Sequence, residues 1–323
     1  MTITKLGDMI IPSNFAAYTA EQAVAKNKFF KGGIIASNPQ LASLLEVGGK
    51  TINMPFVKPL TGDSEVPSET NDMGIGNIST SEDIARRQLR VKAWGENQLA
   101  SLLSGDNVMD RISDAVSDYW SAELSKILIS TCTGVFAKLT NKVNDITVKT
   151  GNAALLNPND AIDTKYIIGD SADAITAIAI HSAVYAYMLK MDQITNVPTS
   201  DGKGVIQKYG PLNATVLVDD SVPYDSTTKV GAMYLYGPGA FGFVESNNGI
   251  EAAEITRNPL KGLGENILIS RKQFVLHPLG VQWNEPTSSI TSPANSDLET
   301  ATRWTKVKED KNIYLAQFKF KIA

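Results

Sequence analysis

The sequence predicts an α+β fold, and three patterns along the chain carry that prediction. Two segments that alternate apolar and polar residues flank a long polar stretch between residues 51 and 94, which is typical of a hairpin. Apolar residues then recur at three- and four-residue steps over residues 106–137, which indicates one long helix. The last third of the chain is mostly alternating strands. A chain of 323 residues has room for about two domains and a sizeable core.

Residues 1–50 predict an N-terminal arm. They are rich in Ala and Asn and contain two Gly-Gly pairs, Gly32-Gly33 and Gly48-Gly49. One helix is expected in this arm, from roughly Ala16 to Phe30. A helical hairpin packed on the body fits the same residues, and the sequence leaves that choice open.

Residues 51–94 predict an extended hairpin. Apolar residues alternate along Thr51–Val57, and Pro55 places this strand at a sheet edge because proline has no backbone donor. A second strand is expected from Ile84 to Trp94. The polar stretch between them has few candidate core residues, and a structureless loop of this length is uncommon in a compact domain unless it is functional. We therefore expect the hairpin to project from the body.

The charges of this hairpin are sorted along the chain. All charged residues from Pro59 to Ala85 are acids, and all those from Arg86 to Lys92 are bases. The hairpin could be merely solvated, its bases could hold nucleic acid (although stacking aromatics are missing apart from Trp94), or its acids could meet a basic surface on a neighbouring copy. Under the last hypothesis the residues in contact between copies are Asp63, Glu65, Glu69, Asp72, Arg86, Arg87 and Arg90.

The predicted long helix covers residues 106–137. Asp106 is a plausible N-cap, and Gly134 falls near the end. At 1.5 Å per residue such a helix is roughly 45 Å long, which is unusual for a globular protein. Trp120 lies mid-helix, and we expect it to anchor the core.

An α/β region follows the helix, and a β-rich region follows that. Ser182 is expected to cap the second helix of the α/β region, and Ser296 with Glu299 is expected to form a capping box on a later helix. The predicted helices cover residues 161–169, 182–192 and 295–304. The predicted strands cover residues 174–180, 215–219, 233–236, 250–255, 267–276, 281–283 and 312–322.

Composition excludes several classes of protein. The apolar fraction of 43% and the charged fraction of 20% are those of a folded chain. No apolar stretch approaches the ~20 residues of a membrane span, and the start lacks the pattern of a secretory signal. One cysteine excludes an internal disulfide framework, and with two histidines it leaves no basis for a His/Cys metal cluster. The net charge of −4 argues against a surface that grips nucleic acid throughout.

Nothing in the sequence argues for catalysis. The segment Gly237–Gly242 matches the G-x-G-x-x-G pattern of dinucleotide-binding proteins, but strand and turn residues follow it where that pattern needs a helix. Its glycines are better explained by a tight bend. His181 and His277 have no G-x-S-x-G nucleophile to assist, and Cys132 is expected to be a buried, inert thiol. No catalytic, cofactor-binding or metal-binding residue is therefore predicted.

An ordered series of segments resembles the major capsid proteins of tailed bacteriophages, the family with the Hong-Kong-97-type fold. Each segment is a weak signal, but together they span most of the chain in the family's order. They are Thr51-Ile-Asn-Met-Pro-Phe with Leu60-Thr-Gly-Asp, Ala93-Trp-Gly-Glu-Asn-Gln-Leu-Ala, Ser104-Gly-Asp with Val116-Ser-Asp-Tyr-Trp, Ile178-Ala-Ile-His-Ser-Ala-Val-Tyr, Val218-Asp-Asp-Ser-Val-Pro, Tyr236-Gly-Pro-Gly-Ala-Phe-Gly, and Ile269-Ser-Arg-Lys-Gln-Phe-Val-Leu-His-Pro-Leu-Gly-Val-Gln-Trp.

The resemblance implies a division into parts. Residues 1–50 would be the N-terminal arm and residues 51–94 the extended loop. Residues 95–154 and 261–323 would form the peripheral domain, with its spine helix at 106–137. Residues 155–260 would form the axial domain.

The resemblance also implies a structural function. Copies would form hexamers and pentamers of an icosahedral head that encloses double-stranded DNA without sequence-specific binding. Scaffold, portal and decoration proteins would be partners, and the protein would be located in the virion, which is assembled in the host cytoplasm. Two alternative functions stay open. The chain could be an encapsulin-like shell protein of a cellular nanocompartment, or a nucleotide-dependent α/β enzyme that uses Gly237–Gly242.

Overall fold

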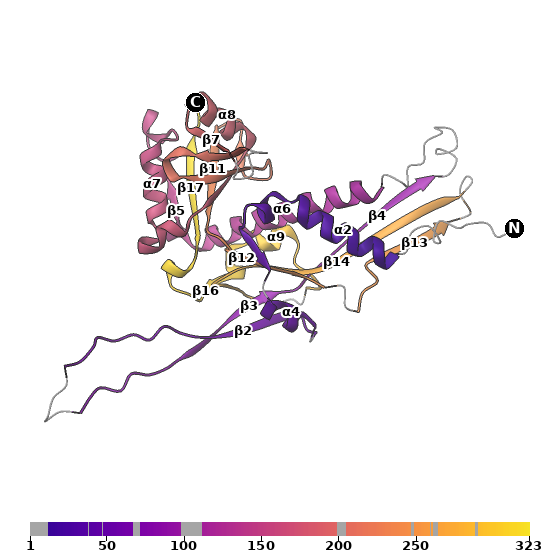
Figure 1. Ribbon diagram of the computed structural model, residues 1–323, viewed down its shortest axis with the longest axis horizontal. Coiled ribbons are helices and arrows are strands. Elements are labelled where there is room, and N and C mark those ends of the chain that lie inside the picture. The colour runs from indigo at the N-terminus through magenta and orange to yellow at the C-terminus, as the bar shows by residue number, and fades with distance from the viewer. Residues whose placement is uncertain are drawn as a thin grey trace.

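The computed structural model describes residues 12–37, 39–46, 48–66, 72–97, 112–198, 205–246, 249–258, 260, 264–287 and 290–323. Figure 1 shows a long central helix, α6, that runs beside a β-rich body, with a separate α/β unit at one end. The hairpin of β2 and β3 projects away from that body. The model thus has the mixed helix and sheet content that the sequence predicted.

Helix α6 (Ile112–Lys138) is 27 residues long, which at 1.5 Å per residue is about 40 Å. This confirms the long helix over the described part of 106–137, while the expected cap Asp106 lies outside the described residues. Gly134 lies inside the helix, where a Cβ atom would overlap the Leu298 carbonyl oxygen. The glycine therefore permits close packing of α9 (Asn295–Leu298).

The first 50 residues, from Pro12 on, lie on the body. Helix α2 (Pro12–Lys26) runs beside α6, and Lys26 forms an ion pair with Asp118 at 2.9 Å. Asn27 links the two elements further, since its Nδ2 donates to the Ser121 carbonyl oxygen at 2.9 Å. The segment continues through α3 (Lys28–Lys31), β1 (Ile35–Ser37) and α4 (Pro39–Glu46). The sequence expected one helix here, and the described part contains three.

A five-stranded sheet forms the body beneath α6. The long strand β14 (Glu265–Pro278) pairs with β4 (Gln88–Asn97) along most of its length. It also pairs antiparallel with β12 (Phe241–Glu245) and β13 (Ala253–Asn258), and β1 joins β12 in parallel. Trp120 is buried against this sheet, where its indole Nε1 donates to Ser270 Oγ at 3.0 Å. The expectation that Trp120 anchors the core is confirmed.

An eight-stranded mixed sheet forms the α/β unit. Its order is β5-β17-β11-β6-β9-β8-β7, and β10 pairs with β11. Helices α7 (Pro158–Tyr166) and α8 (Ser182–Lys190) belong to this unit. The strands are β5 (Val143–Asp145), β6 (Ala177–Ile180), β7 (Ile194–Pro198), β8 (Val205–Tyr209), β9 (Ala214–Val218), β10 (Tyr224–Asp225), β11 (Val230–Tyr236) and β17 (Leu315–Lys321).

Both faces of this sheet are buried, as strand β6 shows. Ala177 and Ala179 belong to the core that contains the α6 side chains. Ile178 and Ile180 belong to a second core that contains residues of α7 and α8. Because successive side chains of a strand point to opposite faces, a continuous apolar run is what such a strand requires.

The strand pairing differs from the predicted grouping at three places. Strand β17 falls in the range expected for the peripheral domain, but it pairs with β11 and β5, and its apolar face of Ala316, Phe318 and Phe320 lies in the core of the α/β unit. Strands β12 and β13 were grouped with the axial domain, but both pair with β14. The predicted second hairpin strand is two strands, β3 (Thr80–Arg86) and β4, and only β3 pairs with β2.

Two helix caps also differ from the expectation. His181, not Ser182, caps α8, since its Nδ1 accepts from the Ala183 amide at 3.1 Å. The helix expected at 295–304 is only the four residues of α9. Asp297 accepts from the Ala294 amide there at 2.9 Å, in place of the expected pair Ser296 and Glu299.

A further pair of strands, β15 (Val281–Trp283) and β16 (Trp304–Lys306), joins the body to the start of β17. Trp283 and Trp304 face each other across this pair with ring centroids 5.2 Å apart. In the part of the chain that the structure describes, no helix is long and apolar enough to cross a membrane.

Candidate assembly arm

The hairpin begins as a regular antiparallel pair. Strand β2 (Thr51–Val57) pairs with β3 in a register that runs from Thr51 opposite Arg86 to Val57 opposite Thr80. Beyond the strands, the Lys58 amide donates to the Ser79 carbonyl oxygen at 2.9 Å. We call residues 59–79 the distal hairpin; residues 67–71 of it lie outside the described residues. Figure 1 shows both of its arms extended, clear of the rest of the molecule.

The hairpin exposes apolar side chains. Ile75 is 100% exposed and Val66 is 88% exposed. Isolated apolar residues are normal on a surface, but several in one projecting segment indicate a surface that another molecule covers. The exposed apolar residues of the hairpin are Val57, Leu60, Val66, Met73, Ile75 and Ile78. We call these six the apolar hairpin residues; the charge pattern of the sequence does not mark them.

The predicted acidic residues lie on the same segment. Asp63, Glu65 and Asp72 are exposed, whereas Glu69 lies outside the described residues. Glu65 bridges the two arms, since its Oε2 accepts from the Gly74 amide at 2.9 Å. The distal hairpin therefore presents both carboxylates and apolar side chains to solvent.

The root of the hairpin is fixed to the body by a buried acid. Asp83 of β3 is buried, and its Oδ1 lies 2.8 Å from Nε2 of the buried His277 on β14. Its Oδ2 accepts from the Gly280 amide at 2.9 Å. Burial alone would raise the pKa of Asp83, but attraction to His277 and the hydrogen bonds outweigh it, so the pKa lies below its usual value. A charged carboxylate thus holds β3 on the body.

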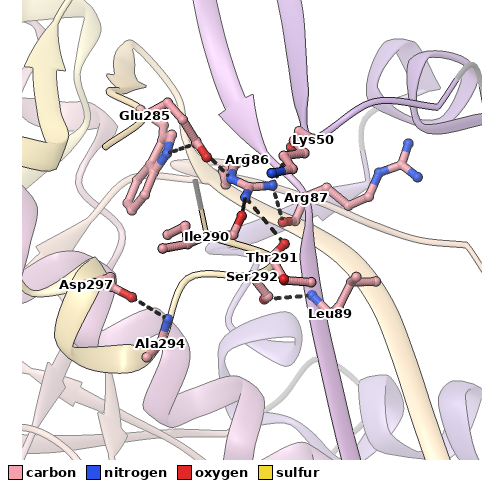
Figure 2. Close-up of polar contacts among 11 residues, drawn as sticks. Lys50, Arg86, Arg87, Leu89, Glu285, Ile290, Thr291, Ser292, Ala294 and Asp297 are labelled. Atoms are coloured by element: carbon pink, nitrogen blue, oxygen red, sulfur yellow. Dashed lines mark hydrogen bonds and ion pairs between the residues drawn. The ribbon is translucent and has the colours of Figure 1, made fainter. Parts of the chain in front are cut away.

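Arg86 provides a second anchor three residues further along β3, and Figure 2 shows its guanidinium at the centre of a group of backbone carbonyls. Only 4% of this residue is exposed. Its Nη1 donates to the Lys50 carbonyl oxygen and its Nη2 to that of Ile290, both at 2.8 Å. Its Nε lies 3.0 Å from Glu285 Oε2. One side chain thereby joins the start of β2, the end of β3 and the loop that precedes α9.

Glu285 is itself held in place. Its Oε2 accepts from the indole Nε1 of Trp283 at 2.9 Å. Nearby, the Leu89 amide donates to Ser292 Oγ at 3.0 Å (Figure 2), which ties the start of β4 to the same loop. The contacts come from segments about 200 residues apart in sequence, so the hairpin root depends on the completed fold.

The other two arginines of the predicted contact set also bind their own chain. Arg87 donates through Nη2 to the Leu45 carbonyl oxygen at 2.7 Å. Arg90 donates to the Pro293 carbonyl oxygen at 2.6 Å and to Asn295 Oδ1 at 3.0 Å. Burial is the main cause that lowers the pKa of each guanidinium. Each of the three arginines thus donates to groups of its own chain and fixes the hairpin to its own body, and a contact of Arg86, Arg87 or Arg90 with another copy stays a prediction.

The glycine-rich segment Gly237–Gly242 is a turn followed by the start of a strand. Residues 237–240 join β11 directly to β12, so a strand follows where a dinucleotide site needs a helix. A Cβ atom on Gly237 would lie 2.6 Å from Tyr314 Cβ, and Gly239 has φ of +64°. The bend explains these two glycines, and the geometry gives the nucleotide-dependent alternative no support.

Comparison with known proteins identifies the family. The family model described as "Major capsid protein 13-like" matches residues 96–313. The "Major capsid protein" of Bacillus phage SPP1 is 35% identical over 327 aligned residues, which cover 100% of this chain and 99% of that protein.

The chain belongs to the major capsid protein 13-like family.

Solved structures agree on the fold of this capsid protein. The capsid of Ralstonia phage GP4 matches with a TM-score of 0.57 at 8% identity, over 92% of each chain. The head structure of Helicobacter pylori bacteriophage KHP40 matches with a TM-score of 0.53 at 11% identity, over 92% of this chain and 91% of that one. The predicted Hong-Kong-97-type fold is confirmed, and the resemblance to tailed-phage capsid proteins is confirmed by family membership.

Family membership also decides between the functions that the sequence left open. A phage capsid protein is a component of the virion and is present there in many copies. Neither the nanocompartment shell nor the nucleotide-dependent enzyme is favoured.

Proposed function

We propose that copies of this chain assemble through the distal hairpin into hexamers and pentamers of a closed icosahedral head around double-stranded DNA. The observation that carries the proposal is a hairpin with a buried, doubly anchored root and exposed apolar side chains beyond it. A rigid root with an adhesive end is what a contact between copies requires, because a contact made by a fixed arm loses less conformational entropy.

The free energies involved favour repeated contacts over a single strong one. Burying one aliphatic side chain contributes about 1.5–3 kcal/mol, so the six apolar hairpin residues contribute roughly 9–18 kcal/mol. Association costs about 4–15 kcal/mol in lost freedom of motion and ordering. Because the two ranges overlap, one hairpin contact need not hold two copies together, whereas many such contacts closed into a ring would. Heterologous contacts, in which one copy's arm meets a different surface on the next, produce such rings.

The two sheets suggest how the subunit is divided in the shell. The eight-stranded unit, residues 143–236 with 315–321, would take the axial place around each ring. Helix α6 and the five-stranded sheet would form the peripheral part. These proposed boundaries follow the hydrogen-bonded strands and differ from those expected from the sequence.

The proposal extends to the contents of the head and to its partners. A net charge of −4 suits a wall that encloses DNA without holding it, since tight phosphate binding would hinder packing and release. Scaffold, portal and decoration proteins would be partners during assembly in the host cytoplasm. Under this proposal the protein acts as a structural subunit and not as an enzyme.

The test changes the apolar surface of the distal hairpin and leaves its length unaltered. Replacing Leu60, Val66 and Ile75 with serine should give a folded subunit that forms no shells in electron micrographs. The matched control is Leu60→Met, Val66→Ile and Ile75→Val, which keeps the surface apolar and should assemble. Because these residues are exposed, the thermal unfolding temperature Tm should differ little among the three proteins. Normal shells from the serine variant would exclude the hairpin as the adhesive element.

A further inference from the structure

A cleft of about 920 Å³ lies between the root of the hairpin and the body. One wall consists of residues 56–59, at the end of β2 and just beyond it. The opposite wall consists of two segments of the body, residues 238–240 and 306–309. We call it the root cleft. Its volume is in the range of about 300–1,000 Å³ that is typical of sites for small molecules.

Hydrogen bonds hold both walls of the root cleft in place. The Val307 and Lys308 amides both donate to the Gly280 carbonyl oxygen, at 3.0 and 3.3 Å. On the hairpin side, the Lys58 amide donates to the Ser79 carbonyl oxygen at 2.9 Å, directly beyond the β2–β3 ladder. The cleft is therefore preformed, and a ligand that enters it would lose little of its binding free energy to the ordering of the protein.

The interior of the root cleft is apolar and contains an aromatic ring. Phe56, Leu279 and Val307 line it, and each is partly covered by its own chain. The Nζ atom of Lys308 lies 5.5 Å from the centroid of the Phe56 ring, which is within the range of a cation–π contact. Such a lining favours an apolar or aromatic ligand, because aromatic rings stack on one another and on aliphatic side chains.

The rim of the root cleft is basic. Its lysines are Lys58, Lys306 and Lys308. Lys306 and Glu309, the acid of the lining, both have partners of opposite charge in ion pairs. Among the described residues, no carboxylate lies within ion-pair distance of Lys58 or Lys308. These two ammonium groups, one on each wall, can therefore meet an anion.

The lining and the rim together select the ligand. A free inorganic anion would leave the apolar lining in contact with water, and a neutral hydrocarbon would make no use of the two ammonium groups. We propose that the root cleft is a binding site for a small aromatic molecule that carries an anionic group, such as a carboxylate, sulfonate or phosphate.

In this site the aromatic part lies against Phe56, Leu279 and Val307, and the anion lies between Lys58 and Lys308. Because one wall belongs to the hairpin and the other to the body, the ligand links the two. The inference concerns the single subunit and does not depend on the proposed function.

Two fluorescent probes of similar shape test the charge of the ligand. Anilinonaphthalene sulfonate carries the anion, and phenylnaphthylamine has the same rings without it. In fluorescence titrations of the unassembled subunit, the sulfonate should bind more tightly than the neutral probe. Lys58→Gln with Lys308→Gln should raise the Kd of the sulfonate about tenfold and leave that of the neutral probe unchanged. The control Lys149→Gln with Lys190→Gln removes two lysines of the α/β unit and should change neither Kd.

A further variant tests the position of the site. Val307→Trp should weaken the binding of both probes, because the indole occupies the space that the ligand needs. Circular dichroism shows whether this variant is folded; if it is not, the comparison of the two probes decides alone. An unchanged Kd of the sulfonate in the lysine variant, an equal loss for both probes in that variant, or wild-type binding by folded Val307→Trp would each overturn the inference.

Discussion

Replacing Arg86 with alanine should destabilise the subunit by about 3–5 kcal/mol, because it removes a buried charged donor from several partners at once. The two shortest hydrogen bonds, to the Lys50 and Ile290 carbonyl oxygens at 2.8 Å, are worth about 1.5–3 kcal/mol each for a charged donor. The ion pair with Glu285 adds less, because that side chain is 33% exposed and solvent screens it.

The magnitude converts into a measurable thermal shift. An unfolding entropy of about 2.1 cal/mol/K per residue gives roughly 0.7 kcal/mol/K for the chain, so Tm should fall by about 4–7 °C. Calorimetry or circular dichroism on the unassembled subunit measures this. The control Lys92→Ala changes an exposed residue of β4 and should shift stability by less than about 0.5 kcal/mol.

Arg86→Lys should lie between the wild type and Arg86→Ala, because one ammonium cannot reproduce the planar set of donors. The unfolding entropy converts the expected loss of stability for Arg86→Ala into a fall in Tm of several degrees. A Tm within about 1 °C of the wild-type value would refute the role of Arg86 as an anchor of the hairpin.

Three further predictions concern buried groups. Because the pKa of Asp83 is lowered in the folded protein, its charge stabilises the fold at pH values above the ordinary pKa of 3.8. This stabilisation is lost as the pH falls through the pKa of the folded state. The Tm of Asp83→Asn should therefore fall less than the wild-type Tm when the pH is lowered below about 5. Gly134→Ala should lower stability by about 1–3 kcal/mol through overlap with Leu298 and Trp304, despite alanine's helix preference, whereas Gly95→Ala, which meets nothing closer than 4.0 Å, should not. Burial raises the pKa of Cys132 to about 12, so iodoacetamide at pH 8 should modify it only after unfolding; rapid native modification would contradict the packing of α6.

The elements that local patterns determine could be predicted from the sequence. The alternation in Thr51–Val57 gave β2, and the three- and four-residue spacing gave α6, because the period of apolar residues reflects the geometry of each element. The neighbours of each strand could not be predicted in this way. The alternation in β17 predicts that Ala316, Phe318 and Phe320 share one buried face, but it does not indicate which strands pair with the two edges of β17.

The anchor was missed for a physical reason. Arg86, Arg87 and Arg90 were grouped as surface charge because arginine is usually exposed. Their partners are backbone carbonyl groups of distant segments. Every residue has such a carbonyl group, so the sequence does not indicate which ones accept these hydrogen bonds. One signal was available: Asp83 occupies the same side of β3 as Ala85, and an acid on a buried face needs a partner such as His277.

The apolar hairpin residues were missed for a different reason. They are scattered among glycines and polar residues, so no periodicity marks them. The sequence predicts that the segment projects, but only the structure shows that these side chains have no cover within the described part of the subunit. Exposure, which depends on the whole fold, distinguishes an adhesive arm from a solvated loop.

The most direct test of the account is a high-resolution electron cryomicroscopy map of assembled particles. We predict that residues 59–79 of each copy lie against another copy, with the apolar hairpin residues of that range covered there: Leu60, Val66, Met73, Ile75 and Ile78. A map in which the hairpin folds back on its own body, while other surfaces make every contact between copies, would contradict the central claim.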